Sequence, residues 1–378
     1  MAAQLIAGGR VATPGGVLDP GWVLVEDGSI SAVGEGTPVD RPDARKTEAG
    51  GCWVVPGFVD IHCHGGGGAY FTDAGQVEQA VAAHRRHGTT TMLASLVSRP
   101  VPELVEQVAA LREFVTGGLL AGVHLEGPFL SAARCGAHDP AVLRPPDAAS
   151  VDTLLATGQG TIRMVTIAPE LDGAVPAVKR LVDAGVLAAV GHTDARAEDI
   201  LPAVDAGASV ATHLFNGMRP LHHREPGPIG TLLDDERVTV ELICDLVHLH
   251  PTVVHLAARH ASAQRTVLIT DAISAAGAGD GVYEIGGLEV TVTDGVPTLA
   301  GGGSLAGSTL TMDTAFRNFV QNCGLGVLEA VAATATRPAE LLGLGNVTGR
   351  IADGYAADLV LLDESLHPNA VMKGGAWV

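Results

Sequence analysis

Eight short apolar runs recur through the middle of the chain, and each ends in a polar residue, a glycine or a small residue. They span residues 57–62, 90–95, 120–126, 162–168, 186–192, 209–213, 238–244 and 266–271. Segments with a helical spacing of apolar residues lie between them, at 76–87, 101–115, 174–184 and 252–261. Continuous apolar runs are typical of strands buried on both faces, and strand–helix alternation indicates a parallel sheet. Eight such units predict an α/β fold, a (β/α)₈ barrel of the TIM type.

The two ends of the chain have a different pattern from the middle. Short β segments separated by glycine, proline and aspartate are expected at 4–6, 22–26, 30–33 and 52–55, and again at 349–351, 358–362 and 370–378. We therefore expect residues 1–55 and 346–378 to build one small β-sandwich beside a barrel of residues 56–345. A hairpin at 283–299 and helices starting near Thr309 and Leu325 should follow the eighth strand.

Polar residues with metal-binding chemistry end five of the eight runs. They are His62 and His64 after the first, Glu126 after the third, His192 after the fifth, His213 after the sixth and Asp271 after the eighth. In a barrel these strand ends meet on one rim, and two histidines two residues apart face the same side of a strand. A single His-x-His or one histidine ending a strand is usually structural. Together, these imidazoles and carboxylates predict a catalytic centre for a divalent metal.

Composition and charge limit the kinds of partner and the cellular compartment that fit this chain. The formal net charge of −19 disfavours nucleic acid or an anionic membrane as the main partner, so an anionic substrate would need a local cluster of basic residues. Apolar stretches are shorter than the ~20 residues of a membrane span, and the first residues lack the pattern of a signal peptide. The five cysteines are scattered and form no CxxC pair, which is typical of reduced thiols. We expect a cytoplasmic protein.

Several motifs extend beyond the candidate ligands. They are Pro56–Gly68 around the two histidines, His124–Phe129, Ala168–Glu170, Gly191–Thr193, Ala211–Met218, Arg224–Gly227, Asp245–His248, Thr270–Ala272 and Leu305–Leu310. With these motifs, the chain resembles the N-acetylglucosamine-6-phosphate deacetylase family of the amidohydrolase superfamily. The resemblance runs in the expected order from about residue 50 to residue 345.

The resemblance implies hydrolysis of the N-acetyl group of N-acetyl-D-glucosamine 6-phosphate to D-glucosamine 6-phosphate and acetate. It also implies a divalent metal, with Zn²⁺ the expected ion, at one or two per subunit. Glu126, His192 and His213 match the ligands common to the family, and some relatives lack the His-x-His pair. Because both His62 and His64 are present, we expect a second cation bridged through Glu126. Asp271 matches the catalytic acid and base, and His138 matches the histidine that polarises the acetyl carbonyl.

Further residues match the family's substrate contacts. They are Ala137, His138, Asn216, Gly217, Arg224, His248, Leu305, Ala306 and Gly307. Arg224 resembles a phosphate contact supplied across a dimer interface, which implies a homodimer. Cys135 stands where many relatives have a lysine, so it is either a bystander or a regulatory thiol that affects metal access or redox sensitivity.

Three alternative functions make different demands on the sequence. A dihydroorotase-like enzyme would need a lysine at the fourth strand end, but Lys46, Lys179 and Lys373 lie elsewhere. A barrel that binds metal without catalysis is disfavoured by the presence of both Asp271 and His138. Deacetylation of N-acetylgalactosamine 6-phosphate, or of another N-acetylated sugar phosphate, stays open because the motifs do not settle the stereochemistry of a single hydroxyl.

Overall fold

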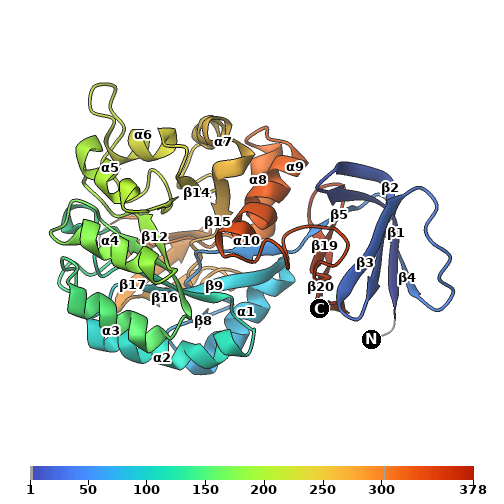
Figure 1. Cartoon of the computed structure of the whole chain (residues 1–378), viewed down its shortest axis with the longest axis horizontal. Helices are drawn as coiled ribbons and strands as arrows, with labels where there is room; N and C mark the ends of the chain where they lie inside the picture. Colours follow the sequence, from blue (N-terminus) through green and yellow to red (C-terminus); the bar gives the residue numbers. More distant parts are fainter. Residues whose placement is uncertain (1–2, 302) are drawn as a thin grey trace.

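The computed structural model describes residues 3–301 and 303–378, and its parallel barrel confirms the predicted fold class (Figure 1). Each barrel strand pairs in parallel with the next along the chain: β6 (Phe58–Asp60), β9 (Thr89–Val97), β10 (Gly122–Glu126), β11 (Ile162–Ile167), β12 (Leu187–Val190), β13 (Val210–Ala211), β14 (Thr239–Ile243) and β15 (Thr266–Ile269). The barrel closes where the Asp271 amide donates to the His62 carbonyl at 2.8 Å, next to a parallel bridge between Cys63 and Ala272.

Helices surround these strands and bury one apolar face each against them. They are α1 (Val77–Arg86), α2 (Val101–Thr116), α3 (Ala148–Gly158), α4 (Ala174–Asp183), α5 (Ala197–Asp205), α6 (Gly227–Asp234), α7 (Pro251–Arg265), α8 (Met312–Gln321), α9 (Val327–Val331) and α10 (Arg337–Leu341). In α4 the buried residues Ala174, Ala177, Val178 and Leu181 follow the i, i+3, i+4, i+7 spacing of one helix face. The helices expected from this spacing are confirmed.

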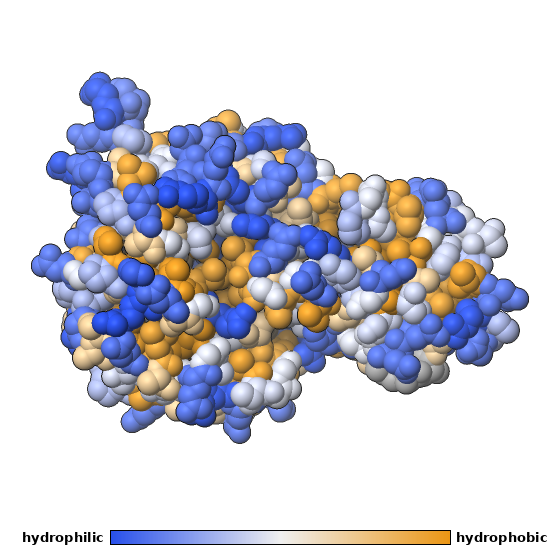
Figure 2. Space-filling view, in the orientation of Figure 1, coloured by the Kyte–Doolittle hydropathy of each residue, from blue (hydrophilic) through white to orange (hydrophobic). Residues whose placement is uncertain are grey.

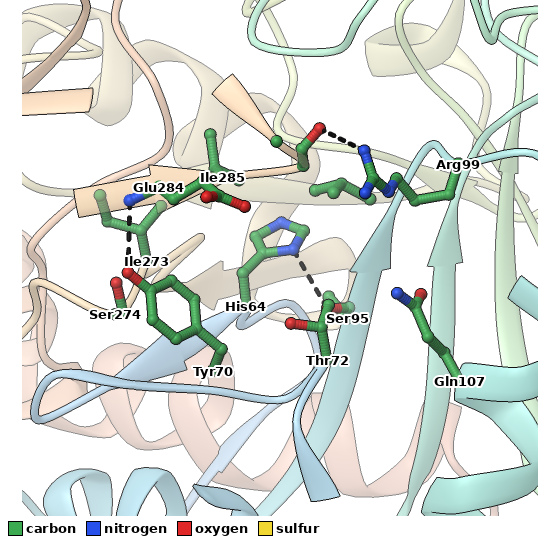
Figure 3. A pocket seen from close by; sticks show the side chains of 13 residues that line it. His64, Tyr70, Thr72, Ser95, Arg99, Gln107, Ile273, Ser274, Glu284 and Ile285 are labelled. Carbon is green, nitrogen blue, oxygen red and sulfur yellow. Dashed lines mark hydrogen bonds between the residues drawn. The ribbon is translucent and has the colours of Figure 1, made fainter. Parts of the chain in front are cut away.

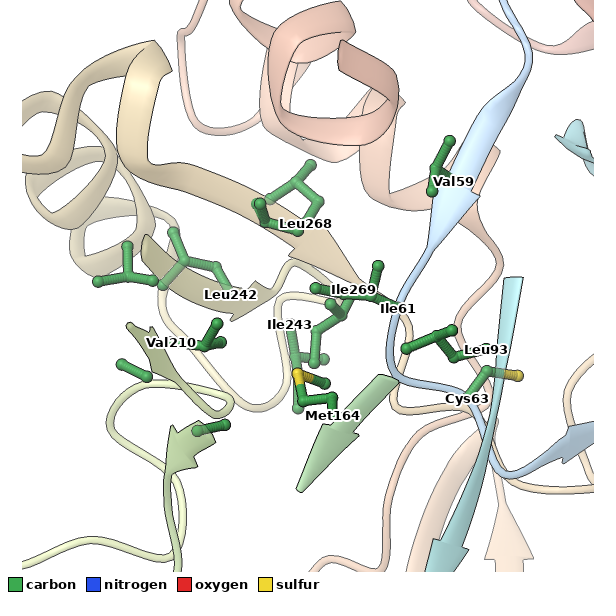
Figure 4. Close-up of a cluster of buried hydrophobic side chains, with 14 of the residues drawn as sticks. Val59, Ile61, Cys63, Leu93, Met164, Val210, Leu242, Ile243, Leu268 and Ile269 are labelled. Atoms are coloured by element: carbon green, nitrogen blue, oxygen red, sulfur yellow. The ribbon is translucent and has the colours of Figure 1, made fainter. Parts of the chain in front are cut away.

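The strands are fixed by a large apolar core, part of which is drawn in Figure 4. Val59, Ile61, Leu93, Leu242 and Leu268 are completely buried in it. Burial of each such side chain stabilises the fold by about 1.5–3 kcal/mol. The barrel is therefore a packed solid, and the residues that follow its strands stand on a rigid base.

Both chain ends contribute to a second sheet beside the barrel (Figure 1). Its strands are β1 (Gln4–Thr13), β2 (Gly16–Glu26), β3 (Ser29–Glu35), β4 (Arg45–Glu48), β5 (Trp53–Pro56), β19 (Leu359–Leu362), β20 (Pro368–Lys373) and β21 (Ala376–Trp377). The antiparallel pair β5–β19 joins the two ends. The prediction of a strand at 349–351 is wrong. The Gly349 carbonyl accepts from the Thr336 hydroxyl at 2.8 Å, and the segment pairs with no strand. Ile351 is nevertheless buried in the apolar cluster that packs against this second sheet.

Two segments outside the barrel strands and helices are relevant to the site. The predicted hairpin is confirmed and gains a strand, giving β16 (Gly281–Ile285), β17 (Leu288–Thr293) and β18 (Val296–Leu299). Residues 219–226 form a loop that projects beyond α5 and α6, and its surface is hydrophilic (Figures 1 and 2). No helix within the described ranges has both the length and the apolar character to cross a membrane.

Candidate metal centre and active site

The six residues singled out at the strand ends lie together at one rim of the barrel. Their potential donor atoms form two groups, each within 4.8 Å: His62, His64, Glu126 and Asp271 in one, and Glu126, His192 and His213 in the other. All six side chains are buried. Glu126, at the end of β10, belongs to both groups and lies between them.

Each oxygen of Glu126 faces one pair of imidazoles. Its Oε1 is 3.0 Å from Nε2 of His192 and 2.9 Å from Nε2 of His213. Its Oε2 is 3.2 Å from Nε2 of His64 and 3.5 Å from Nε2 of His62. This is the arrangement in which one carboxylate can serve two cations.

The hydrogen bonds of the ring Nδ1 atoms test whether a cation fits. In His62, His64 and His192, Nδ1 lies 3.2 Å from Glu241 Oε2, 3.2 Å from the Ser95 carbonyl and 2.8 Å from the Arg134 carbonyl. Because these partners only accept, each Nδ1 carries a proton and each Nε2 is left to bind a second proton or a metal. The Nε2 atoms of three imidazoles thus face one carboxylate, an arrangement that needs positive charge between them, supplied by added protons or by a metal ion. The residues present fit a divalent metal.

The charges of the site depend on one another. Burial would raise the pKa of Glu126, but His62 and His138 outweigh it and hold that pKa well below 4.5. Burial would likewise raise the pKa of Asp271, yet the neighbouring His62 and His64 lower it to about 2. Conversely, burial would lower the pKa of His62, but Glu126 and Asp271 raise it well above 6.5. Both carboxylates are therefore ionised at neutral pH and demand positive charge beside them.

His138 offers a neutral hydrogen-bond donor to the same centre. Its Nδ1 accepts the Ser98 amide at 3.2 Å, so the proton resides on Nε2, which lies 3.4 Å from Oε2 of Glu126. Burial lowers the pKa of His138 to about 4, although Glu126 opposes this shift. The imidazole is therefore uncharged at neutral pH and keeps one N–H directed at the centre.

A cavity of about 280 Å³ opens above the centre. Among the predicted residues, its walls contain His64, Glu126, Ala137, His138, His192, His213, Asn216, Gly217, His248, Asp271, Leu305 and Gly307. His62 is buried and does not line it. Most of the predicted site is thus brought into one chamber.

Three further predicted residues lie off this chamber. Ala306 is fully buried in a small apolar cluster with Ile285 and Val290, so its side chain does not reach the cavity. Arg224 is exposed on the projecting loop, where its Nη1 donates to His223 Nε2 at 2.9 Å. Cys135 is half-buried directly after the short 3₁₀ helix Ala132–Arg134. Arg224 therefore does not line the chamber of its own subunit.

Sequence reasoning missed three residues of the cavity wall, namely Gly136, Ile285 and Ser304. Gly136 is next to the predicted Ala137, so the motif itself could have included it. Ile285 ends β16, and its place at the cavity could not be read without knowing where the inserted sheet folds back. Glu241 was also missed, although it is the charged residue inside an otherwise apolar run.

Left-handed backbone marks the site. His192, His213 and Asp271 have φ values of 45°, 28° and 50°, a region that residues other than glycine rarely adopt. Each of the three follows closely on a barrel strand. Such strain costs on the order of 1–3 kcal/mol per residue and persists where the surrounding structure holds it for function.

A second, smaller cavity of about 70 Å³ lies beside His64 (Figure 3). Tyr70, Arg99, Ser274 and Glu284 contribute to its walls, and Arg99 Nη1 donates to the Gly286 carbonyl at 3.0 Å. His64 and Ile285 line both cavities. The ring of His64 is thus part of a wall between two chambers.

Comparison with known proteins agrees with this geometry. The Amidohydrolase family model matches residues 53–378. The chain is 38% identical to N-acetylgalactosamine-6-phosphate deacetylase of Escherichia coli O157:H7 over 97% of each chain. It is 36% identical to N-acetylglucosamine-6-phosphate deacetylase of Bacillus subtilis, covering 93% of this chain and 91% of that protein.

Solved structures give the same assignment. A mutant of N-acetyl-D-glucosamine-6-phosphate deacetylase from Mycobacterium smegmatis, in complex with N-acetyl-D-glucosamine-6-phosphate, superposes with a TM-score of 0.96 at 46% identity and covers 100% of this chain and 99% of its own. The deacetylase from Thermotoga maritima has a TM-score of 0.89 at 35% identity, with 99% of both chains covered. The chain therefore belongs to the amidohydrolase family and, within it, to the N-acetylglucosamine-6-phosphate deacetylase family of hydrolases.

Proposed function

We propose that this enzyme hydrolyses the N-acetyl group of N-acetyl-D-glucosamine 6-phosphate, releasing D-glucosamine 6-phosphate and acetate. The observation that carries the proposal is the pairing of a carboxylate, Asp271, with a neutral N–H donor, His138, on the wall of one cavity above the ligand cluster. The names of relatives that match over nearly the whole chain support the same substrate.

Two cations, with Zn²⁺ the expected ion, would be held at the rim. His192, His213 and one oxygen of Glu126 would bind one cation. His62, His64 and the other oxygen of Glu126 would bind the second cation. When bound, a divalent cation supplies Lewis acidity, which polarises a carbonyl and lowers the pKa of water from 15.7 toward about 7. Two imidazoles and one carboxylate oxygen per cation leave coordination positions open, as in catalytic sites.

Asp271 carries the proton in this reaction. Its carboxylate is ionised and its Oδ1 lies 3.2 Å from Nε2 of His64, at the base of the cavity. It takes a proton from the attacking water as the new C–O bond forms at the acetyl carbon. It then returns that proton to the sugar nitrogen as the C–N bond breaks, which yields a neutral amine and acetic acid; the acid then loses its remaining proton to solvent and leaves as acetate.

His138 stabilises the oxygen that gains negative charge. Its Nε2–H points into the centre and is held there by the bond between Nδ1 and the Ser98 amide. A donor fixed before the reaction needs no reorganisation when charge develops on the carbonyl oxygen. Because the ring of His138 is uncharged, its N–H can donate to the carbonyl oxygen without the strong attraction to Glu126 that a charged imidazolium would have.

The remaining wall residues bind the sugar and its phosphate. His248 donates from Nδ1 to Asp245 at 2.6 Å, and this carboxylate raises the pKa of His248 against the effect of burial. A raised pKa favours the protonated ring, which suits a phosphate in a protein whose net charge is −19. Ala137, Asn216, Gly217 and the segment 305–307 surround the sugar, with Ala306 contributing backbone atoms.

Arg224 completes the phosphate site from a second subunit. It stands exposed on the projecting loop, away from its own cavity, with His222 and His223 beside it. A planar guanidinium matches phosphate oxygens well. We therefore propose a homodimer in which each loop reaches the neighbouring active site.

Cys135 and the location of the enzyme complete the proposal. The Cys135 thiol follows Arg134, whose carbonyl holds His192, so its modification would disturb a metal ligand. All five cysteines are free, which together with a phosphorylated substrate supports action in the cytoplasm.

The galactosamine epimer is a second candidate substrate, favoured by the 38% identity to a deacetylase named for it. The deciding experiment measures kcat/KM for both N-acetylated hexosamine 6-phosphates, with and without a chelator. We expect the glucosamine substrate to be preferred and the chelator to abolish turnover. A preference for the galactosamine compound would change the substrate, and turnover that survives complete metal removal would overturn the mechanism.

A further inference from the structure

A buried carboxylate on β14 lies behind the metal-binding cluster. Glu241 is 0% exposed, and its Oε2 is 3.2 Å from Nδ1 of His62 and 3.1 Å from the backbone nitrogen of His213. Its Oε1 has no hydrogen-bond partner among the described residues. One oxygen of Glu241 thus accepts from both halves of the centre, from a ring in one and from the backbone in the other.

A buried carboxylate is unfavourable unless its environment compensates for the lost water. For Glu241, hydrogen bonds from His62 and the His213 amide replace the lost water. The free-energy cost of burying this carboxylate therefore depends on the positions of those two groups. In return, Glu241 holds the proton of His62 on Nδ1 and leaves Nε2 free to bind a metal. Carboxylates that accept from a ligating histidine also increase the basicity of its other nitrogen.

The neighbouring His124 does not take this role. Its ring meets the His62 ring edge to face at 4.5 Å, but its two nitrogens are engaged by Ser95 Oγ and Thr166 Oγ1, each at 2.9 Å. His124 therefore packs against His62 without bonding to it. The orientation of the His62 ring about its own axis is set by Glu241.

We infer that Glu241 is a positioning residue that fixes the tautomer and orientation of His62 and so determines how tightly the cation of His62 and His64 is held. This rests on the proposed two-cation centre. Glu241 does not itself line the cavity, so it acts through the residues it contacts and does not meet the substrate.

The test titrates metal-free protein with Co²⁺, followed by visible absorbance, and with Zn²⁺, followed by calorimetry. Wild type should bind two equivalents. Glu241→Gln keeps the shape of the side chain and an acceptor oxygen but removes the charge. The affinity for one equivalent of metal should fall about 10- to 100-fold, while the affinity for the other stays near its wild-type value. The readout is metal affinity, which a merely structural role would not change selectively.

Asp313→Asn is the matched control. Asp313 is a buried carboxylate on α8 that also accepts from a histidine, with its Oδ1 3.1 Å from Nδ1 of His87, but it contacts none of the proposed ligands. The same carboxylate-to-amide change there should leave both metal affinities unchanged. Glu241→Asp, which keeps the charge but withdraws it from His62, provides a second variant and should also weaken one equivalent.

The possible outcomes distinguish the role of Glu241 from the two-cation centre on which it rests. Two equivalents in wild type with unchanged binding in Glu241→Gln, or in Glu241→Asp if the glutamine variant does not fold, would overturn the role of Glu241 and leave the proposed function intact. A single equivalent in saturated wild type would overturn the two-cation centre and, with it, this inference. Equal weakening in Asp313→Asn would reduce the effect to general destabilisation and also overturn it.

Discussion

Oδ1 of Asp271 lies 3.2 Å from Nε2 of His64 at the base of the cavity. If Asp271 carries the proton, Asp271→Asn should lower kcat by about 10²–10⁴-fold, because the amide can neither take a proton from water nor return one. Acetate release measures the rate, and metal analysis serves as the control. Metal content should be nearly retained, and wild-type kcat in the variant would refute the assignment.

Metal binding should release protons. Without a cation, the carboxylates hold the pKa of His62 well above 6.5 and, against burial, raise that of His64 to about 8, so both rings are protonated at pH 7. A metal replaces those protons, on the order of one or two per protein. Calorimetry of Zn²⁺ binding in buffers of different ionisation enthalpy measures the number. Heats that do not depend on the buffer would show that the rings are already neutral.

Gly217 is expected to control the position of His192. A Cβ at Gly217 would lie 2.8 Å from Nδ1 of His192, and its φ is +59°, so Gly217→Ala combines backbone strain with a clash. Gly118 offers a control, since its φ is +77° and a Cβ there meets no atom within 4 Å. Both alanine variants should lose roughly 1 kcal/mol of stability through strain. Only Gly217→Ala should also lose metal affinity and activity, and equal activity in the two would contradict the prediction.

His84 should make the protein sensitive to acid. Burial lowers its pKa to about 4, and its Nε2 lies 2.8 Å from the Gly65 carbonyl. The unfolded chain takes up a proton below about pH 6.5, whereas the native chain does not until about pH 4, so stability is present above pH 6.5 and is lost as the pH falls toward 4. By pH 5 the loss from this group should be about 2 kcal/mol.

Denaturant unfolding of metal-free wild type and His84→Gln at pH 7 and pH 5 measures this contribution. Metal-free protein is used because acid also displaces bound metal. The unfolding free energy of the glutamine variant should fall less between the two pH values than that of wild type. Equal falls would mean that His84 is not held neutral in the native state.

The strand ends were predictable because two independent patterns coincide there. An apolar run marks a buried strand, and a terminal histidine or acid marks the point where the strand reaches the polar rim, so the positions of His192, His213 and Asp271 follow from local sequence. The same reasoning could not find Glu241. Its contact with His62 spans 179 positions and depends on how strands face one another across a closed barrel.

Other residues escaped prediction for different physical reasons. Ile285 reaches the cavity because the inserted sheet folds back over the rim, a tertiary relation with no local signal. The segment 349–351 has the composition of a strand, but a threonine side chain takes the carbonyl that a neighbouring strand would need.

The hydrogen bond from the Asp271 amide to the His62 carbonyl joins the last barrel strand to the first. The proposed proton carrier and a proposed ligand therefore lie on the two sides of the seam where the barrel shuts. A chain that has not yet brought its eighth strand to its first has neither a complete metal centre nor a group to move the proton. The complete centre therefore exists only in a chain whose barrel is closed.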